Sequence, residues 1–254
     1  MSSVNEKMTA IADAIRDKTG GTDALTLDDM AEAIPEVYEA GQQSEYDRFW
    51  DAVQLDENGI PKTYLNYHFA GRAWTDDNFR PKYDIYPGSS ATGLFRETPI
   101  TNLKQILESC GVALYTSRMT SATGSFGYSQ LTVLPKLDFS SLTSATNTFT
   151  NSSNLHTIEE VVVSENTTFA SNSFTGCTGL THMIMTGTLA KKGLDLHWSK
   201  LLDVESLDSI VVVLQDKTSV GGTWTVTISP ESSAKLSDAK KAEASQKGWT
   251  FVVL

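Results

Sequence analysis

The sequence of 254 residues contains only two cysteines, Cys110 and Cys177, and no closely spaced Cys-x-x-Cys pair. A disulfide-rich scaffold needs more cysteines, and a structural zinc site usually needs such a pair. We therefore expect both cysteines to be small buried hydrophobic residues. A bridge between them would close a loop of 67 residues, and no feature of the sequence favours it.

Long apolar runs are also missing. No stretch approaches the roughly 20 apolar residues that a membrane-spanning helix needs. The opening residues M-S-S-V-N-E-K-M lack the basic and apolar regions of a secretory signal. The sequence therefore predicts neither a signal peptide nor a transmembrane segment. We expect a folded protein that stays inside the cell or leaves it without a cleaved signal.

Positive charge is scarce at one end of the chain. Residues 1–58 carry 14 acidic and four basic side chains, a net charge of −10, whereas residues 59–254 carry 17 acidic and 16 basic side chains, a net charge of −1. Binding to nucleic acid or to an anionic membrane needs basic patches, so neither partner is expected. The acidic segment either contacts a basic protein or is simply a solvated surface.

Catalytic motifs are absent. The chain has no GxSxG elbow, HExxH pair, P-loop or GxGxxG turn. Adjacent carboxylates in a strand point to opposite faces, so Asp76-Asp77 and Glu159-Glu160 do not form an acid–base pair. The histidines are scattered and predict no metal site. We therefore expect no enzymatic activity, no metal and no cofactor. The four histidines are His68, His156, His182 and His197.

Residues 1–58 read as a helical segment. Residues 4–18 form an amphipathic pattern with Met8, Ile11, Ala12 and Ile15 on one face. A second short helix is predicted from Thr26 to Pro35 and a third over residues 35–54. The third helix could pack on the first two or on copies of itself, so oligomerisation through it stays open. A turn at residues 56–59 marks a domain boundary.

Residues 59–90 are rich in aromatic side chains. Two interpretations compete: the aromatic rings close the open end of the repeats that follow, or some of them form a stacking platform for a sugar ring. The candidate ligand-binding residues are Tyr64, Tyr67, Trp74, Tyr83 and Tyr86.

Residues 91–214 repeat a unit of one phenylalanine, a short polar stretch, a leucine or isoleucine and a further aliphatic residue. The phenylalanines are 31, 23 and 25 residues apart, close to the period of leucine-rich repeats. Each unit predicts one short strand and a turn, stacked so that the apolar positions face inward. Leu207 and Ile210 suggest a degenerate fifth unit. The predicted repeat core is Phe95, Phe126, Leu131, Phe149, Leu155, Phe174, Cys177 and Leu180.

Residues 215–254 predict a closing cap of strand, helix and strand. Residues 224–228 alternate as in a strand, Ser237 is placed to cap a helix reaching about Gln246, and residues 249–254 form a last apolar strand. Before this cap, the β-branched run Ile210–Leu214 predicts a buried strand. The fold class expected for the whole chain is α+β.

Two parts of the chain resemble known families. The segment Leu137–Met183 is similar to BspA-type leucine-rich repeats, with Leu142, Ala145, Phe149, Leu155 and Ile158 at matching positions. Ser152 stands where that family often has cysteine, and Cys177 restores the cysteine in the next unit. The resemblance implies a leucine-rich-repeat solenoid with a helix and strand closing its end.

The N-terminal stretch I-A-D-A-I-R-D-K-T-G-G-T-D-A-L-T-L-D-D-M-A-E-A-I is similar to a segment of structural proteins from tailed phages, including tail and baseplate components. The stretch F-A-G-R-A-W-T-D-D-N-F-R-P-K-Y-D-I resembles phage repeat proteins as well. These resemblances imply a virion protein, with residues 1–58 attached to other virion proteins and the repeats displayed towards a glycan or protein of the host surface.

Three functional hypotheses follow. The first is a non-enzymatic component of a phage tail tip, baseplate or other appendage, assembled as a homotrimer or another cyclic oligomer. The second is a bacterial surface adhesin, which should carry an export signal or wall anchor that neither end of this sequence shows. The third is a glycan hydrolase, which lacks a plausible acid pair.

Overall fold

The computed structural model describes residues 11–17, 48–59, 69–71 and 74–254. The chain divides into two compact units, Met1–Val53 and Gln54–Leu254. The division lies close to the turn at residues 56–59 that the sequence suggested as a boundary. Each unit is described by itself below.

In the first unit, residues 11–17 are helical and Ala12 and Ile15 are buried. This agrees with the amphipathic pattern predicted for residues 4–18. Residues 48–51 are also helical, and the rings of Phe49 and Trp50 meet edge to face at 5.0 Å. Met8, the predicted second helix and most of the predicted third helix lie outside the described residues.

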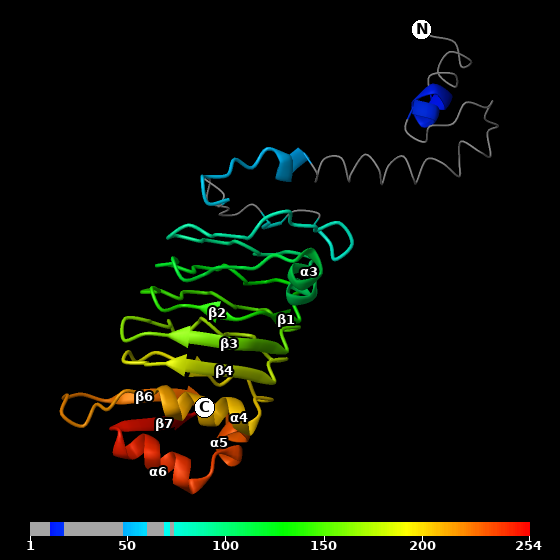
Figure 1. The fold of residues 1–254 in the computed structure, drawn as a ribbon. Helices are drawn as coiled ribbons and strands as arrows, with labels where there is room; N and C mark the ends of the chain where they lie inside the picture. Colours follow the sequence, from blue (N-terminus) through cyan, green and yellow to red (C-terminus); the bar gives the residue numbers. More distant parts are fainter. Residues whose placement is uncertain (1–10, 18–47, 60–68, 72–73) are drawn as a thin grey trace. The chain divides into compact units, whose positions relative to one another are not determined.

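The second unit mixes helices and strands, and its described strands all pair in parallel (Figure 1). In one sheet, β1 and β2 both pair with β3, which pairs with β4; the other sheet has the order β5-β6-β7. The elements are α3 (Leu103–Cys110), β1 (Val133–Leu134), β2 (Leu137–Asp138), β3 (Thr157–Val163), β4 (His182–Gly187), β5 (Asp195–Leu196), α4 (Val204–Val213), β6 (Trp224–Ile228), α5 (Pro230–Lys235), α6 (Asp238–Gln246) and β7 (Trp249–Val253).

Successive turns of this unit lie one on another (Figure 1). The backbone N–H of Phe126 donates to the carbonyl of Thr148 at 2.8 Å, and that of Phe149 donates to Ser173 at 2.9 Å. Short parallel bridges, such as Ser90 with Ser121, add further links. Each turn thereby satisfies backbone groups of the next, which is why chain segments with little regular strand still stack.

Phenylalanine rings form a column inside the stacked turns. Phe95, Phe126, Phe149 and Phe174 are stacked in sequence, with centroid distances of 6.1, 5.6 and 4.9 Å. Phe69 extends the column to Phe95 at 5.1 Å. Burying one such side chain stabilises the fold by about 1.5–3 kcal/mol. Every predicted repeat-core residue is fully buried: Phe95, Phe126, Leu131, Phe149, Leu155, Phe174, Cys177 and Leu180.

Small polar side chains satisfy the carbonyls of the phenylalanine column. The hydroxyl of Ser152 donates to the carbonyl of Phe126 at 2.6 Å, and the thiol of Cys177 donates to that of Phe149 at 3.0 Å. Ser152 and Cys177 therefore make equivalent hydrogen bonds in successive turns. Both cysteines are free thiols, so Cys110 and Cys177 form no bridge. Burial raises the pKa of Cys177 to about 12.

A second periodic motif, which the sequence analysis did not single out, is Ser-Ala-Thr. It occurs at residues 90–92, 121–123 and 144–146, and its alanine is fully buried each time. The serine and threonine hydroxyls of each copy hydrogen-bond at 3.0–3.2 Å. The small alanine fits into the packed interior of each of these turns, whereas Phe169 pairs with Ala145 in the next turn.

The strand predicted at Ile210–Leu214 is wrong, because these residues belong almost entirely to helix α4. The side chain of Asp203 accepts a hydrogen bond from the N–H of Ser206 and so caps the helix. Ile210 and Val211 are buried while Val212 is 60% exposed, a helical pattern. A short run of β-branched residues does not by itself distinguish a strand from a buried helix. The proposed fifth repeat unit therefore contains a helix.

The end of the chain follows the expectation more closely. The strands predicted at 224–228 and 249–254 are confirmed as β6 and β7, and the helix after Ser237 is confirmed as α6. Helix α5 was not predicted, although Ser229 caps it and Pro230 begins it, both of which are common start signals. Among the described residues, no helix is long and apolar enough to cross a bilayer.

Candidate functional site

Tyr86 and Tyr115 form a stacked pair in the turns that precede β1 in the chain. Ile85 and Leu114 form a parallel bridge, with the N–H of Tyr115 donating to the carbonyl of Ile85 at 2.9 Å. Ile85 and Leu114 point into the core, so the following residues, Tyr86 and Tyr115, point outward. Their ring centroids are 4.8 Å apart and the ring planes differ by 8°. Neighbouring strands lie about 4.8 Å apart, so this stacking follows directly from the register.

Tyr86 and Tyr115 differ in exposure. Tyr86 is half-buried, whereas Tyr115 is 44% exposed. Partial burial raises the pKa of Tyr86, with further contributions from Asp84 and Tyr115. The Tyr86 phenol therefore stays protonated at neutral pH and can donate a hydrogen bond. Tyr86 covers one face of the Tyr115 ring and leaves the rest of that ring exposed.

A pocket of about 240 Å³ opens between α3 and the sheet. Ala113 lines it and lies two residues before Tyr115, on the other side of the bridging residue Leu114, so in this extended segment both side chains point to the same side. The floor is apolar and the rim is charged. The lining residues are Lys104, Leu107, Glu108, Val112, Ala113, Leu114, Pro135, Lys136 and Glu159.

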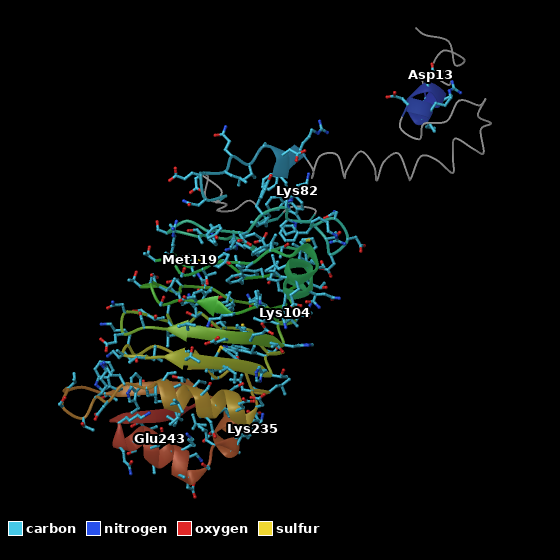
Figure 2. All side chains as sticks on the ribbon, viewed as in Figure 1. Asp13, Lys82, Lys104, Met119, Lys235 and Glu243 are labelled. Carbon is cyan, nitrogen blue, oxygen red and sulfur yellow. The ribbon has the colours of Figure 1, made fainter. Side chains whose placement is uncertain are left out.

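Ion pairs surround this pocket. Lys104, labelled in Figure 2, lies 2.5 Å from Glu159 and 3.5 Å from Glu108, and Lys136 lies 2.8 Å from Glu160. The hydrogen bond to Glu159 raises the pKa of Lys104. Hydrogen bonds from Lys136 and Thr186 lower the pKa of Glu160. The rim therefore carries both signs of charge at neutral pH, and each lysine already has a carboxylate partner.

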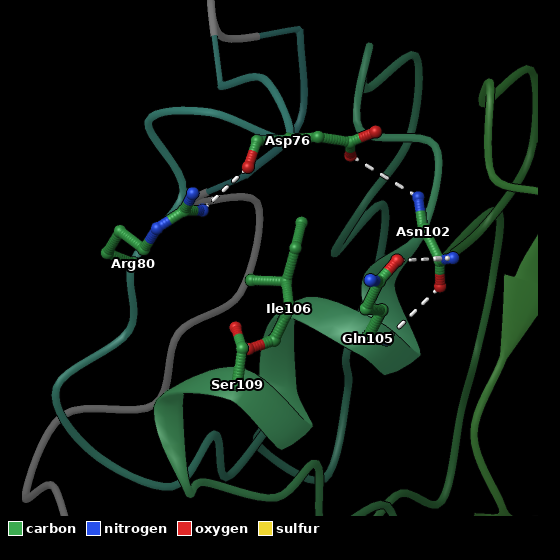
Figure 3. A pocket seen from close by; sticks show the side chains of 6 residues that line it. All are labelled: Asp76, Arg80, Asn102, Gln105, Ile106 and Ser109. Carbon is green, nitrogen blue, oxygen red and sulfur yellow. Dashed lines mark hydrogen bonds between the residues drawn. The ribbon is translucent and has the colours of Figure 1, made fainter.

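A second pocket, of about 310 Å³, lies at the start of α3 (Figure 3). Its Asp76 carboxylate accepts hydrogen bonds from the N–H groups of Thr101 and Asn102 at 2.8 and 3.3 Å. Arg80 donates to the carbonyls of Asp76 and Phe79 at 2.6 and 3.0 Å. These polar groups hold the chain around the start of α3, so we assign them a structural role.

The structure places the candidate aromatic residues from the sequence in different environments. Trp74 is 1% exposed and packs against Phe69 and Phe79, so its ring is part of the core. Tyr83 is half-buried, and Tyr86 belongs to the stacked pair. Tyr64 and Tyr67 lie outside the described residues. The structure adds Tyr115, which stacks on Tyr86, and two lysines that line the pocket, Lys104 and Lys136.

Two histidines lie beside aspartates. The Nδ1 atom of His182 is 2.7 Å from a carboxylate oxygen of Asp203, and that of His197 is 2.6 Å from Asp195. Burial alone would raise the pKa of Asp203, but hydrogen bonds from Ser206 and His182 lower it below its usual value. Because Asp203 also caps α4, we read its pair with His182 as structural. Within the described part of the chain, no three His, Cys, Asp or Glu side chains are grouped to hold a metal.

Comparison with protein-family models, with curated proteins and with solved structures gives no significant match to this chain.

Proposed function

We propose that this protein is a non-enzymatic structural component of a phage tail tip, baseplate or other virion appendage. In this proposal, residues 1–58 attach the chain to other virion proteins. The stacked turns of the second unit form a leucine-rich-repeat solenoid displayed for binding to a glycan or protein of the host surface. The observation that carries the proposal is the exposed Tyr115 ring, with a pocket beside it, on a tightly packed interior.

The interior supports a scaffold role. The phenylalanine column and the hydrogen bonds from Ser152 and Cys177 use the inward residues of each turn for packing. Variation between turns is therefore left to the outward side chains. Inward residues that pack and outward residues that vary suit a binding surface. The packed interior holds the outward side chains in place, and such rigid positioning lowers the entropic cost of binding.

The N-terminal segment supports attachment. Its resemblance to phage structural proteins suggests a virion, and its net charge of −10 suits contact with a basic protein. Virion appendages are built on rotational symmetry, so a cyclic homo-oligomer, with a trimer favoured, is part of the proposal.

The test compares the full chain with residues 59–254. We expect the shorter chain to remain folded and to keep its binding to host cells as a purified protein, but to be missing from assembled particles. Immunoblotting of purified particles and a cell-binding assay give the two readouts. Normal incorporation of the shorter chain would contradict the attachment role. Detection of the native protein on bacterial surfaces without particles would favour the adhesin alternative.

A further inference from the structure

The stacked tyrosines lie next to the pocket. Ala113 and Tyr115 flank the bridging residue Leu114, and two residues of extended chain span about 7 Å. Ala113 also lines the pocket together with Lys136. An exposed aromatic ring, an apolar floor and a charged rim therefore lie within the reach of a single small ligand.

We propose that this surface binds an uncharged saccharide, with one pyranose ring on Tyr115 and the next sugar unit over the pocket. The inference rests on the proposed function, because it names the chemical class of the host-surface partner. The hydroxyl of Tyr86 and the side chains of Lys104, Lys136 and Glu159 supply hydrogen bonds to the sugar hydroxyls.

The chemistry of the surface fits a sugar ring. A pyranose has an apolar face of C–H groups and a polar rim of hydroxyls. The C–H face packs on the exposed part of the Tyr115 ring, as amphipathic ligands pack on tyrosine and tryptophan. Hydroxyls both donate and accept, so they can bond to the ammonium group of Lys136 and to the carboxylate of Glu159.

The ion pairs favour an uncharged sugar over a phosphorylated or acidic one. Lys104 is already paired with Glu159 and Glu108, and Lys136 with Glu160. An anionic ligand would have to displace these carboxylates or approach three of them. A neutral hydroxyl can instead bond to the outer atoms of an ion pair without breaking it.

The size of the pocket favours a sugar unit over a protein. Its volume of about 240 Å³ lies below the roughly 300–1,000 Å³ of pockets that hold drug-sized ligands. A stable protein partner would instead need to cover about 800 Å² on each side. One or two sugar units fill the surface that the structure offers.

The test uses the full chain and uncharged tetrasaccharides built from glucose, galactose or N-acetylglucosamine. Binding is followed by titration calorimetry or ligand-observed NMR. We expect at least one tetrasaccharide to bind, with an affinity that changes less than twofold between about 50 and 500 mM salt, since screening acts on charged ligands. The Tyr115→Ala variant should bind about tenfold more weakly, because it removes the aromatic contact.

Matched variants distinguish loss of the Tyr115 ring contact from an indirect effect of a substitution on the fold. Tyr115→Phe keeps the ring and should retain most of the affinity. Tyr128 is also 44% exposed but stacks on Arg96 elsewhere, so Tyr128→Ala should leave the affinity unchanged. Ala113→Phe fills part of the pocket while both tyrosines are kept, so it should weaken binding and provides a second route should Tyr115→Ala fold poorly.

Host-cell binding by the same proteins distinguishes this inference from the proposed function. If no tetrasaccharide binds, or if Tyr115→Ala and Tyr128→Ala lose affinity equally, the saccharide assignment is wrong. If cells are still bound in that case, the host-surface role stands with a partner of another class. If the wild-type chain binds sugar but no host cell, the proposed function fails instead.

Discussion

The inside and the outside of the stacked turns follow different rules. Inside, one phenylalanine recurs at each turn, and Phe95, Phe126, Phe149 and Phe174 stack in a column. Outside, the paired positions Asp138, Val162 and Thr186 all differ. Repetition inside holds the turns at fixed spacing, and variety outside leaves room for a binding surface. The column accounts for stability, and we propose that the outward face serves recognition.

Breaking the column should have the largest effect. Phe126→Ala removes a fully buried ring between two stacked neighbours and leaves a cavity. We expect the free energy of unfolding to fall by about 3–5 kcal/mol. Chemical denaturation measures it, with the exposed Tyr128→Ala as a control that costs at most about 1 kcal/mol. If Phe126→Ala and Tyr128→Ala lowered the free energy of unfolding by similar amounts, the distinction between interior and surface would be wrong.

A smaller change tests the polar support of the column. Ser152→Ala removes one of the two hydroxyls that donate to the carbonyl of Phe126, the other being that of Ser129, and should cost at most about 1 kcal/mol. Ser152→Cys should cost less, because Cys177 makes the equivalent bond one turn later. Thermal unfolding of the two variants compares them. A cysteine that destabilises more than alanine would show that the two turns are not equivalent.

The cap of α4 should contribute a pH-dependent effect below about 1 kcal/mol, because Asp203 is partly exposed. The folded-state pKa of Asp203 is lower than its ordinary value of 3.8. Its stabilising contribution is therefore complete above pH 3.8 and is lost as the pH falls through the folded-state pKa. Asp203→Asn keeps a capping side chain but removes this titration. We expect the two unfolding curves to converge in acid; a constant difference would refute the assignment.

The reactivity of the two cysteines compares the interior with the surface in the unmutated protein. Cys177 is buried with a pKa of about 12, whereas Cys110 is partly exposed. Only the thiolate reacts with a disulfide reagent, so Cys177 should be inert at pH 8. We expect one reactive thiol in the native protein and two in denaturant. Two rapidly reacting native thiols would place Cys177 outside the packed interior.

The sequence was informative where a pattern recurs and weak where it does not. The spacing of Phe126, Phe149 and Phe174 predicted the buried positions, because stacking turns must repeat their inward residues. The run at Ile210–Leu214 misled, because its helical character depends on the cap at Asp203 and on which side of α4 packs. Helix α5 carried recognisable start signals at Ser229 and Pro230.

The candidate site was predicted only in part. Tyr86 was identified from the density of aromatic residues around it, whereas Tyr115 stands alone in the sequence. Its role depends on pairing between Ile85 and Leu114, which are 29 residues apart. Trp74 belonged to the same aromatic segment yet is buried. Composition indicates that a segment is aromatic, but only the register shows which rings reach the surface.

The most direct test of the division between interior and surface is host-cell binding by the full-length Tyr115→Ala variant, measured beside its free energy of unfolding. We predict that binding falls about tenfold relative to Tyr128→Ala, while the unfolding free energies of both variants stay within about 1 kcal/mol of the wild-type value. Unchanged binding by a folded Tyr115→Ala variant would contradict the account.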